Sequence, residues 1–423
     1  MTEAQHRYQT LKQKGIPAVL FEGGWFGCWS FVVEIDAGVE PLRGEEGLAE
    51  IRRAVVTHRE KMQSASLNDE APFSEGYVGF LEYEFGERWV DVSPGAAESE
   101  GGSALFYKTK KVHAFRTELS PSPSATVTTS AGESPPVAPP PSYQKAFAAV
   151  QEALYSGESY QVNYSEEFIE PYAGDPFDLY CHLAKLNPSS HQCYFPLFSL
   201  PHDGPSTEST PTLGSALISN SPELLFTLQA NGKFTSRPIK GTAPRFGDPL
   251  LDRQAAEALV KSNKDAAELM MIVDLVRNDM GKVARTGSVV VEKHRELESY
   301  SNVFHTVSTI TAQLRPELDW YDALRALFPG GSVTGCPKKR TMELIRELER
   351  GRRSAYCGSA GLIDLSGAAE FNILIRTATY LPNKKELVFR SGGGLVVDST
   401  LEAEYAELCD KAEVVRSALG SAN

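Results

Sequence analysis

Hydrophobic and polar residues follow two different spacings along the chain, and the two spacings predict different elements. In residues 18–35 and 76–90, apolar and polar positions alternate and aromatic side chains cluster, which predicts strands separated by glycine turns. Further strands are predicted at residues 160–168, 216–228, 233–242, 360–365, 369–381 and 386–397. Helices are predicted at residues 47–61, 143–155, 176–186, 252–283, 337–350 and 401–419. Connections of hairpin length between strands favour antiparallel sheets with helices outside, an α+β fold.

The chain is predicted to contain two regions. Residues 119–142 are too rich in proline, serine and threonine to pack, which indicates a linker or an excursion from a sheet. We therefore expect an N-terminal sheet-rich region, residues 1–141, that ends in this linker, followed by a second domain, residues 142–423. A similar tract at residues 200–215 is expected to be a surface loop.

Composition and charge argue against several classes of protein. Of the 423 residues, 41% are hydrophobic and 23% are charged, and the net charge of −13 argues against nucleic-acid binding. The sequence has neither a run of 18 apolar residues nor the apolar core of a signal peptide at its start, so we expect a cytoplasmic protein without membrane contact. The six cysteines have neither a zinc-binding nor a disulfide spacing.

Two predicted helices each contain a pair of acidic residues three positions apart, a spacing that places both carboxylates on one face. The pairs are Asp265 with Glu268, and Glu404 with Glu407. Carboxylates from two helices suit Mg²⁺, which takes one or two protein carboxylates and keeps several waters. The alternative for either pair is an exposed acidic face.

Helix capping is another role for part of this set. Ser262 and Asp265 fit a capping box, so Asp265 could cap the helix start instead of binding a ligand. In the last helix, Ser399 and Glu402 fill the capping role, which leaves the acidic pair of that helix unexplained by capping. Lys411 lies on the same face as this pair and could form an ion pair or bind an anion.

Three further features are suited to an anionic ligand. Residues 329–340, PGGSVTGCPKKR, form a glycine-rich turn into a helix without the GK[ST] ending of a nucleotide-binding loop. The run Gly392, Gly393 and Gly394 would let a ligand approach the backbone closely. Arg376, in an apolar strand, needs an anionic partner if it is buried. A dicarboxylate would satisfy these sites together.

Lys240 stands in the stretch RPIKGTAPR, residues 237–245. Pro238 restricts the backbone on one side and Gly241 permits unusual conformations on the other, so the lysine is expected to be held in place. In an extended strand, its side chain points to the face opposite its direct neighbours and could face a pocket. The alternative is a solvated surface lysine, as most lysines are.

These motifs resemble one family, the chorismate-utilising enzymes, and in particular component I of the aminodeoxychorismate synthases and of the anthranilate synthases. The similar motifs are YQVNYS (160–165), SPELLF (221–226), RPIKGTAPR (237–245), KDAAELMMIVDLVRNDMGKV (264–283), FHTVS (304–308), PGGSVTGCPKKRTM (329–342), YCGSAG (356–361), FNILIRTA (371–378) and GGGLVVDSTLEAEYAELCDKA (392–412). The resemblance implies two antiparallel sheets packed as a β-sandwich flanked by helices. It also implies that chorismate and Mg²⁺ bind between the two halves, with residues 142–423 as the chorismate-binding catalytic domain.

The resemblance assigns roles to individual residues. It implies that Glu268 and Glu407 bind Mg²⁺ directly and that Asp265 and Glu404 reach it through water, although the family more often begins the first pair with Glu. The implied carboxylate-binding set is Tyr356, Arg376, Lys411 and the backbone of Gly392, Gly393 and Gly394, with Thr242 and Ser332 nearby. Residues similar to Glu223 and His305 lie near the ring hydroxyl that leaves.

Two positions separate the branches of the family. The isochorismate branch has a lysine base where this chain has Gln161, which disfavours the addition of water. The anthranilate branch has a small residue where this chain has Lys240, whereas the aminodeoxychorismate synthases have lysine there. The resemblance therefore implies that Lys240 attacks C2 of chorismate and that ammonia then enters at C4, with Glu223 as the proton carrier.

The resemblance also implies a partner. None of the six cysteines lies in the Gly-x-Cys-x-Gly turn of a glutaminase, so we expect a separate glutamine amidotransferase subunit to supply ammonia. The alternatives are an anthranilate synthase component I, and a non-catalytic homologue that senses an amino acid through an N-terminal aromatic pocket. The aromatic residues of segment 21–31 could line a tryptophan pocket of that kind or belong to the core.

Overall fold

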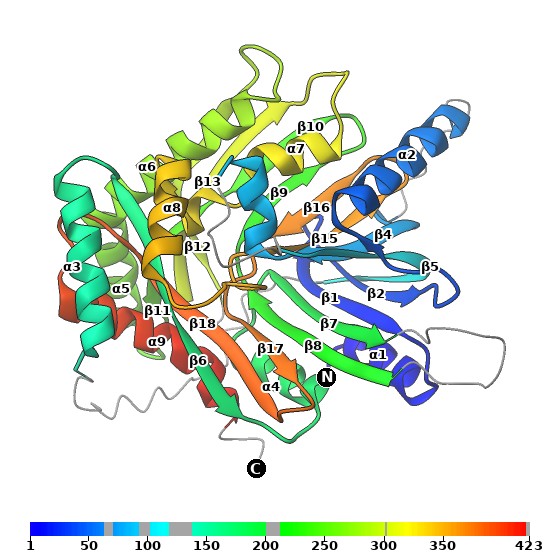
Figure 1. Ribbon diagram of the computed structural model, residues 1–423, viewed down its shortest axis with the longest axis horizontal. Helices are drawn as coiled ribbons and strands as arrows, with labels where there is room; N and C mark the ends of the chain where they lie inside the picture. Colours follow the sequence, from blue (N-terminus) through cyan, green and yellow to red (C-terminus); the bar gives the residue numbers. More distant parts are fainter. Residues whose placement is uncertain (63–70, 93–101, 118–137, 200–211, 301–302, 420–423) are drawn as a thin grey trace.

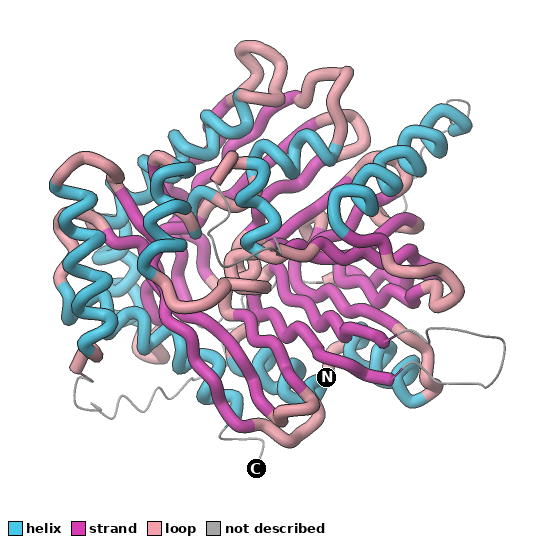
Figure 2. The backbone as a smooth tube through the Cα atoms, viewed as in Figure 1, coloured by secondary structure: helices cyan, strands magenta, loops and turns pink. Residues whose placement is uncertain are grey.

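The computed structural model describes residues 1–62, 71–92, 102–117, 138–199, 212–300 and 303–419. Most of the predicted linker and of the predicted loop at 200–215 lies outside the described residues. The nine helices of the described part surround strands that run through the middle of the molecule (Figure 1, Figure 2). No described helix is both long and apolar enough to cross a membrane.

The described strands form one antiparallel hydrogen-bonded network of 18 strands. They are β1 (Ala18–Trp25), β2 (Trp29–Ile35), β3 (Leu42–Arg43), β4 (Gly76–Leu81), β5 (Ala104–Arg116), β6 (Gln161–Pro171), β7 (His191–Ser199), β8 (Thr212–Ser221), β9 (Leu224–Leu228), β10 (Lys233–Arg237), β11 (Ile239–Pro244), β12 (Val290–Ser299), β13 (Val303–Gln313), β14 (Gly335–Cys336), β15 (Ser359–Asp364), β16 (Ala369–Asn372), β17 (Thr377–Leu381) and β18 (Glu386–Leu395). The predicted α+β class with antiparallel pairing is therefore confirmed.

The long strand β5 makes the network continuous. Its C-terminal part pairs with β2, and its N-terminal part pairs with β3 and β4. One arm of the network runs from β2 through β1, β7, β8, β17, β18 and β6 to β14. The other runs from β4 through β15, β16, β9 and β10 to β13, β11 and β12. Two separate sheets are thus not observed, because β5 belongs to both arms.

The two arms pack against each other through a shared apolar cluster. Phe21 and Phe31 of the first arm are fully buried together with Val78 and Leu362 of the second. The aromatic residues of the 21–31 segment that are buried here therefore belong to the core. Both arms contain strands from the two predicted regions, since β1 pairs with β7 and β4 pairs with β15. The division of the chain at residue 141 stays a prediction.

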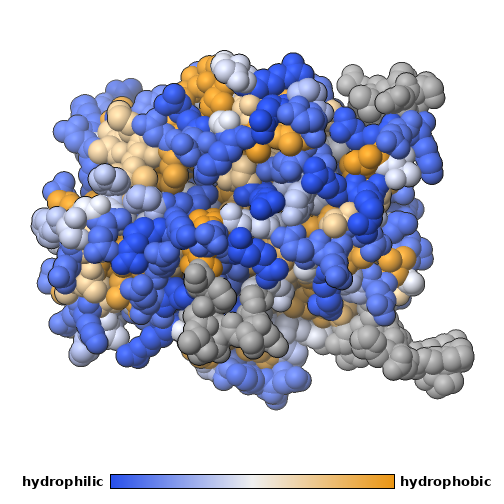
Figure 3. Space-filling model, turned by 45° about the horizontal axis from the view of Figure 1, so that its top comes forward, coloured by the Kyte–Doolittle hydropathy of each residue, from blue (hydrophilic) through white to orange (hydrophobic). Residues whose placement is uncertain are grey.

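Helices cover the outer surfaces of the network (Figure 2). The helices are α1 (Glu3–Gln13), α2 (Gly44–Met62), α3 (Pro141–Tyr155), α4 (Pro176–Leu186), α5 (Pro249–Lys261), α6 (Asn263–Gly281), α7 (Trp320–Leu327), α8 (Lys338–Leu348) and α9 (Leu401–Leu419), with short 3₁₀ turns η1 (Tyr83–Trp89) and η2 (Gly331–Val333). One apolar cluster joins α1, α4 and α9 to the first arm. Another joins α2, α6 and α7 to the second arm. The surface seen in Figure 3 is mostly hydrophilic, with small separate hydrophobic patches.

Several predicted elements are divided in the structure. The helix predicted at 252–283 is two helices, α5 and α6, because Ser262 adopts an extended conformation with ψ 114° and its side chain caps α6. The predicted strand 369–381 is also divided, because β16 pairs with β9 in one arm and β17 pairs with β8 in the other. Arg376 lies in this crossing with φ 50° and not inside a strand, which corrects the prediction.

Candidate functional site

Lys240 of β11 lies among charged and glycine residues from α6 and β18. Its Nζ is 3.7 Å from Oε2 of Glu268, and only 16% of its side chain is exposed. A Cβ atom placed on Gly394 would be 3.2 Å from the same Nζ. The side chain is therefore held inside the molecule, as the sequence predicted, and is not a solvated surface lysine.

The backbone on both sides of Lys240 explains its position. The hydroxyl of Thr306, on β13, donates a hydrogen bond to the carbonyl of Lys240. Gly241 has φ +88°, and a Cβ atom there would lie 3.1 Å from Cγ of Asp265 on α6. Because a larger residue at Gly241 would be strained and crowded, glycine lets β11 approach the acidic helix closely.

The glycine run of β18 forms another side of the site. Lys411 of α9 donates a hydrogen bond from Nζ to the carbonyl of Gly392 at 3.1 Å. A Cβ atom on Gly393 would be 3.5 Å from Oε2 of Glu404, and one on Gly394 would be 2.7 Å from Nε2 of Gln161. At these glycines, β18 has no side chains of its own, and side chains of α9 and β6 lie close to its backbone.

The two predicted acidic pairs come together through a lysine that the sequence analysis did not single out. Nζ of Lys264, on α6, is 3.1 Å from Oε1 of Glu404 on α9 and 3.9 Å from Oε1 of Glu268. Glu407 pairs with Lys411 at 2.7 Å. In the sequence, the sign of this role for Lys264 is its place four residues before Glu268. Its contact with Glu404 of α9 depends on the fold.

The pKa directions show how closely these charges are packed. Burial raises the pKa of Glu268, the charges of Lys240 and Lys264 oppose this, and Glu404 reinforces it. The side chain of Glu407 is 52% exposed. Its partial burial favours the neutral form, but Lys411, Lys240 and Lys264 together outweigh this, so the pKa of Glu407 is lowered. The site is thus a mixed cluster of carboxylates and ammonium groups.

The capping roles differ between the two helices. The hydroxyl of Ser262 accepts a hydrogen bond from the backbone N–H of Asp265 at 3.2 Å, which confirms the serine half of the predicted box. The other half is wrong, because the backbone N–H of Ser262 donates to the carbonyl of Leu259 and not to the carboxylate of Asp265. Ser399 donates instead to Oε1 of Glu404 at 2.6 Å. Its predicted cap with Glu402 is therefore wrong, because Glu404 is almost fully buried and accepts the hydrogen bond of the hydroxyl.

The donor chemistry of the cluster is suited to Mg²⁺, whose binding stays a prediction. The carboxylates of α6 and α9 are hard oxygen donors, and Lys264 places a positive charge between two of them. Among the described residues, no group of three or more His, Cys, Asp or Glu side chains is arranged to hold a metal ion. Metal binding would therefore require these side chains, and Lys264 with them, to move.

Glu223 lies between β8 and β9 and is buried. Burial raises its pKa, while the nearby Ser332 hydroxyl and the charges of Lys240 and Lys411 oppose the rise. Glu223, Ser332 and Asp279 of α6 line a small internal cavity of about 10 Å³. A space of this size holds one water-sized molecule. A carboxyl group that keeps its proton more readily than usual is suited to proton transfer.

Arg376 lies near this carboxyl group, and His305 lies near Arg376. Nδ1 of His305, on β13, is 2.8 Å from the hydroxyl oxygen of Thr242 on β11. Burial first, and then the charge of Arg376, lower the pKa of His305 to about 4, so its ring is neutral near pH 7. Burial lowers the pKa of Arg376 as well, and the charge of Glu223 opposes that shift. Arg376 thus has the acidic neighbour that the sequence led us to expect.

Tyr356 packs beside a buried ion pair. Its ring faces the guanidinium group of Arg353, which lies 5.8 Å from the ring centroid. Arg353 pairs with Glu349 at 2.6 Å, and both side chains are buried. No recorded contact joins Tyr356 to Lys411 or to the glycine run within the described residues, so its binding role stays a prediction.

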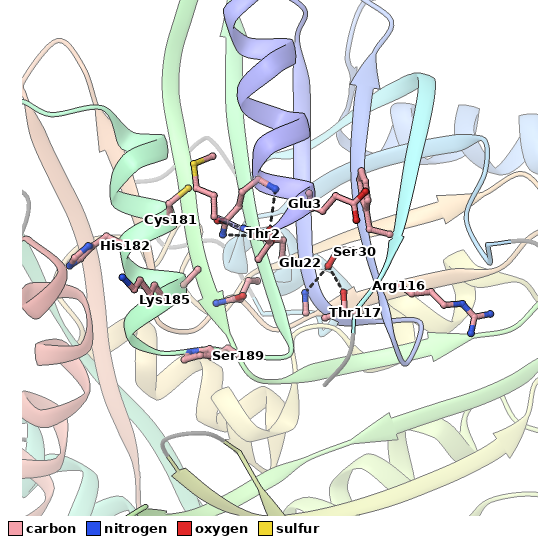
Figure 4. A pocket seen from close by; sticks show the side chains of 18 of the residues that line it. Thr2, Glu3, Glu22, Ser30, Arg116, Thr117, Cys181, His182, Lys185 and Ser189 are labelled. Carbon is pink, nitrogen blue, oxygen red and sulfur yellow. Dashed lines mark hydrogen bonds between the residues drawn. The ribbon is translucent and has the colours of Figure 1, made fainter. Parts of the chain in front are cut away.

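A larger cavity, of about 830 Å³, lies beside the N-terminal helix α1, and Lys240 is not part of its lining (Figure 4). It is lined by residues of α1, β1, β5 and α4, among them Glu22, Arg116 and Lys185. Inside it, Glu22 accepts hydrogen bonds from Gln5 at 2.9 Å and from the hydroxyl of Tyr180 at 2.7 Å. The polar residues that flank the buried aromatics of segment 21–31 thus face this cavity.

Comparison with known proteins connects this geometry to one family. Residues 32–417 match the family described as chorismate binding enzyme. The chain belongs to this family. It is 46% identical over 269 residues to aminodeoxychorismate synthase component 1 of Salmonella typhimurium, a match that covers 64% of this chain and 55% of that protein. The chain thus spans about half the length of this curated relative.

Other chorismate binding enzymes are also similar. The chain is 44% identical to aminodeoxychorismate synthase component 1 of Escherichia coli, over 64% of this chain and 55% of that protein. It is 38% identical to anthranilate synthase component 1 of Aquifex aeolicus, over 64% and 51%. Anthranilate synthase component I of Streptococcus pneumoniae has the same fold, with a TM-score of 0.71, 24% identity and 92% coverage of both chains.

Proposed function

We propose that this chorismate binding enzyme aminates chorismate at C4, as the resemblance to aminodeoxychorismate synthases implies. The product would be 4-amino-4-deoxychorismate, the precursor of p-aminobenzoate and folate. The observation that supports this most directly is the place of Lys240. Its amine lies beside the acidic helix α6 and the glycine backbone of β18, where a ring with two carboxylate groups could reach it.

In the proposed first step, the neutral amine of Lys240 attacks C2 of the chorismate ring. The ring double bond shifts and the bond from C4 to its hydroxyl breaks. The carboxyl group of Glu223 gives its proton to the departing hydroxyl, which leaves as water. Support for this role comes from the raised pKa of Glu223, which keeps the carboxyl protonated to higher pH than an ordinary glutamic acid.

In the second step, ammonia attacks C4 and the bond between C2 and the lysine nitrogen breaks. Lys240 leaves as a neutral amine, and the carboxylate of Glu223 takes one proton from the new ammonium group. Lys411 and Arg376 would hold the carboxylates of the substrate, together with the glycine backbone of β18. His305 is neutral near pH 7, so it would act as a hydrogen-bonding group and not as a charged acid.

Glu268 and Glu407 would hold Mg²⁺ directly, with Asp265 and Glu404 around them. When bound, the ion would supply positive charge that stabilises the departing oxygen and the substrate carboxylates. The chain's own contribution is to place four carboxylates on two neighbouring helices. As in the two-component relatives, ammonia would come from a glutamine amidotransferase subunit.

The proposal can be tested by product analysis of wild-type protein and Lys240→Ala with chorismate, Mg²⁺ and ammonium salt. We expect 4-amino-4-deoxychorismate from the wild type and a loss of at least about 1000-fold in the variant, as when other nucleophiles are removed. Lys261→Ala is the matched control, because Lys261 is exposed and forms an ion pair with Glu257 on the same helix. Anthranilate as the wild-type product would instead identify an anthranilate synthase component.

A further inference from the structure

A second strongly charged cavity lies at the C-terminal end of α6, where Lys282 and Val283 contribute to its lining. Its volume is about 520 Å³, within the usual range of small-molecule sites. The helices α7 and α8, which contribute residues to its lining, lie in the upper part of Figure 1 together with α6. Its lining includes the basic residues Lys282, Arg315, Arg325, Lys338 and Lys339, and a single acidic residue, Asp322.

The charge of this cavity is opposite to that of the whole protein. Five basic residues against one acidic residue face it, although the chain has a net charge of −13. Asp322 is itself paired with Arg52 at 2.7 Å. Arg325 is exposed and forms no ion pair with any residue in the described part of the chain. Carboxylates outside the lining pair with other cations of the cavity, Asp91 with Lys339 at 3.0 Å and Glu317 with Arg315 at 3.6 Å. The positive charge that no carboxylate of the described residues pairs with is therefore that of Arg325.

Apolar side chains form another part of the wall. Trp89 and Phe328 line the cavity with their rings 6.0 Å apart at a steep angle. Val90, Leu318 and Ala326 continue this apolar surface. A wall that combines aromatic rings with cations is suited to an anion that has an apolar ring, because each part of the ligand then has a matching surface.

Asp279 connects this cavity to the proposed catalytic centre. Its carboxylate receives hydrogen bonds from Lys282 and from Lys338, each at 2.7 Å, and both lysines line the basic cavity. The same residue lines the small cavity beside Glu223 and Ser332. An anion in the basic cavity would compete with Asp279 for its two lysines.

We propose that the basic cavity binds a small organic anion with an apolar ring and at least two negative charges, and that its occupation slows turnover by weakening the ion pairs of Asp279. The effect on turnover rests on the proposed function, whereas binding does not. The volume of about 520 Å³, which is that of a small-molecule site, favours a small molecule over an acidic segment of a partner protein.

Binding can be measured through the fluorescence of Trp89, with isophthalate as the probe and inorganic phosphate as the charge-only comparison. We expect isophthalate to change the fluorescence saturably, phosphate to bind at least about tenfold more weakly, and Trp89→Phe to abolish the signal. Arg325→Gln should weaken isophthalate binding about tenfold. Its matched control is Arg277→Gln, because Arg277 is on α6 but pairs with Asp274, outside the cavity lining.

The possible outcomes distinguish binding in the basic cavity from its effect on turnover. No saturable change at Trp89, or equal weakening by Arg325→Gln and Arg277→Gln, would overturn the site. Saturation at Trp89 with an unchanged rate of chorismate amination would overturn the link through Asp279. Isophthalate can also compete for the substrate site, so we expect inhibition through the cavity to lower kcat and to need about tenfold more isophthalate in Arg325→Gln. A wild type that makes no aminated product would contradict the proposed function and leave the binding result standing.

Discussion

Lys240 shows what a single residue can and cannot reveal in the sequence. Its flanking Pro238 and Gly241 indicated a held side chain, and the structure places it 3.7 Å from Glu268. The contacts of Lys240 with residues of other strands could not be predicted. Gly394 lies near Lys240, and Gln161 lies near Gly394. These contacts arise because β18 pairs with β6 and the fold brings this pair close to β11. Sequence spacing reports contacts along one element, and it does not report contacts between distant ones.

His305 provides a test at the same scale, through stability. Its pKa is lowered from 6.5 to about 4, mainly by burial. Between these values the unfolded chain binds a proton that the folded protein does not, so folding stability falls as pH drops from about 6.5 to 4. The full effect is on the order of 3 kcal/mol, at 1.36 kcal/mol for each pKa unit.

Denaturant unfolding of the wild type and His305→Gln at several pH values would measure this effect. The wild type should lose stability relative to the variant as pH falls through that window. A difference in unfolding free energy that stays constant from pH 7 to pH 4 would show that His305 titrates normally in the folded protein.

At the scale of elements, the helices were predicted better than the strands. The bounds of α4 and α9 agree with the prediction, because proline or acidic residues mark their starts and the apolar spacing is regular. The break at Ser262 and the crossing at Arg376 were missed. Both depend on where a neighbouring element lies: α6 has to meet α9, and β16 and β17 join different arms.

The acidic pairs of α6 and α9 lead to a prediction for metal dependence. Glu268→Gln should reduce Mg²⁺-dependent turnover by more than about 100-fold, since even outer partners of a metal site can cost roughly 10- to 100-fold. Mg²⁺ affinity, measured by calorimetry, should fall as well. Glu257→Gln is the control, because this residue is exposed on α5 and pairs with Lys261. Full activity of Glu268→Gln at limiting Mg²⁺ would remove Glu268 from the metal site.

At the scale of the whole molecule, the family resemblance correctly indicated an antiparallel α+β architecture. The continuity of the network through β5 could not be read from sequence, because nothing local shows that one strand pairs with β2 at one end and β4 at the other. The basic cavity was also missed. Its side chains come from η1, α7, α8 and the segments around α6, and they are scattered in the sequence.

The proposed two-component system gives a prediction at this scale. The isolated chain should aminate chorismate with ammonium salts but not with glutamine. Glutamine should become a nitrogen donor only after a glutamine amidotransferase subunit is added. Release of glutamate and aminated product would be followed together by chromatography. Glutamine-dependent turnover by the pure chain would contradict the need for a partner.

The most direct test of the central claim, that Lys240 is the nucleophile, is mass spectrometry of the protein quenched during turnover with chorismate and Mg²⁺ while ammonia is limiting. We predict a ring adduct on the peptide that contains Lys240, which builds up without ammonia and disappears when ammonia is added. The adduct should be absent from Lys240→Ala and present in Lys261→Ala. Efficient formation of 4-amino-4-deoxychorismate by Lys240→Ala, with no adduct on Lys240 of the wild type under any condition, would contradict the account.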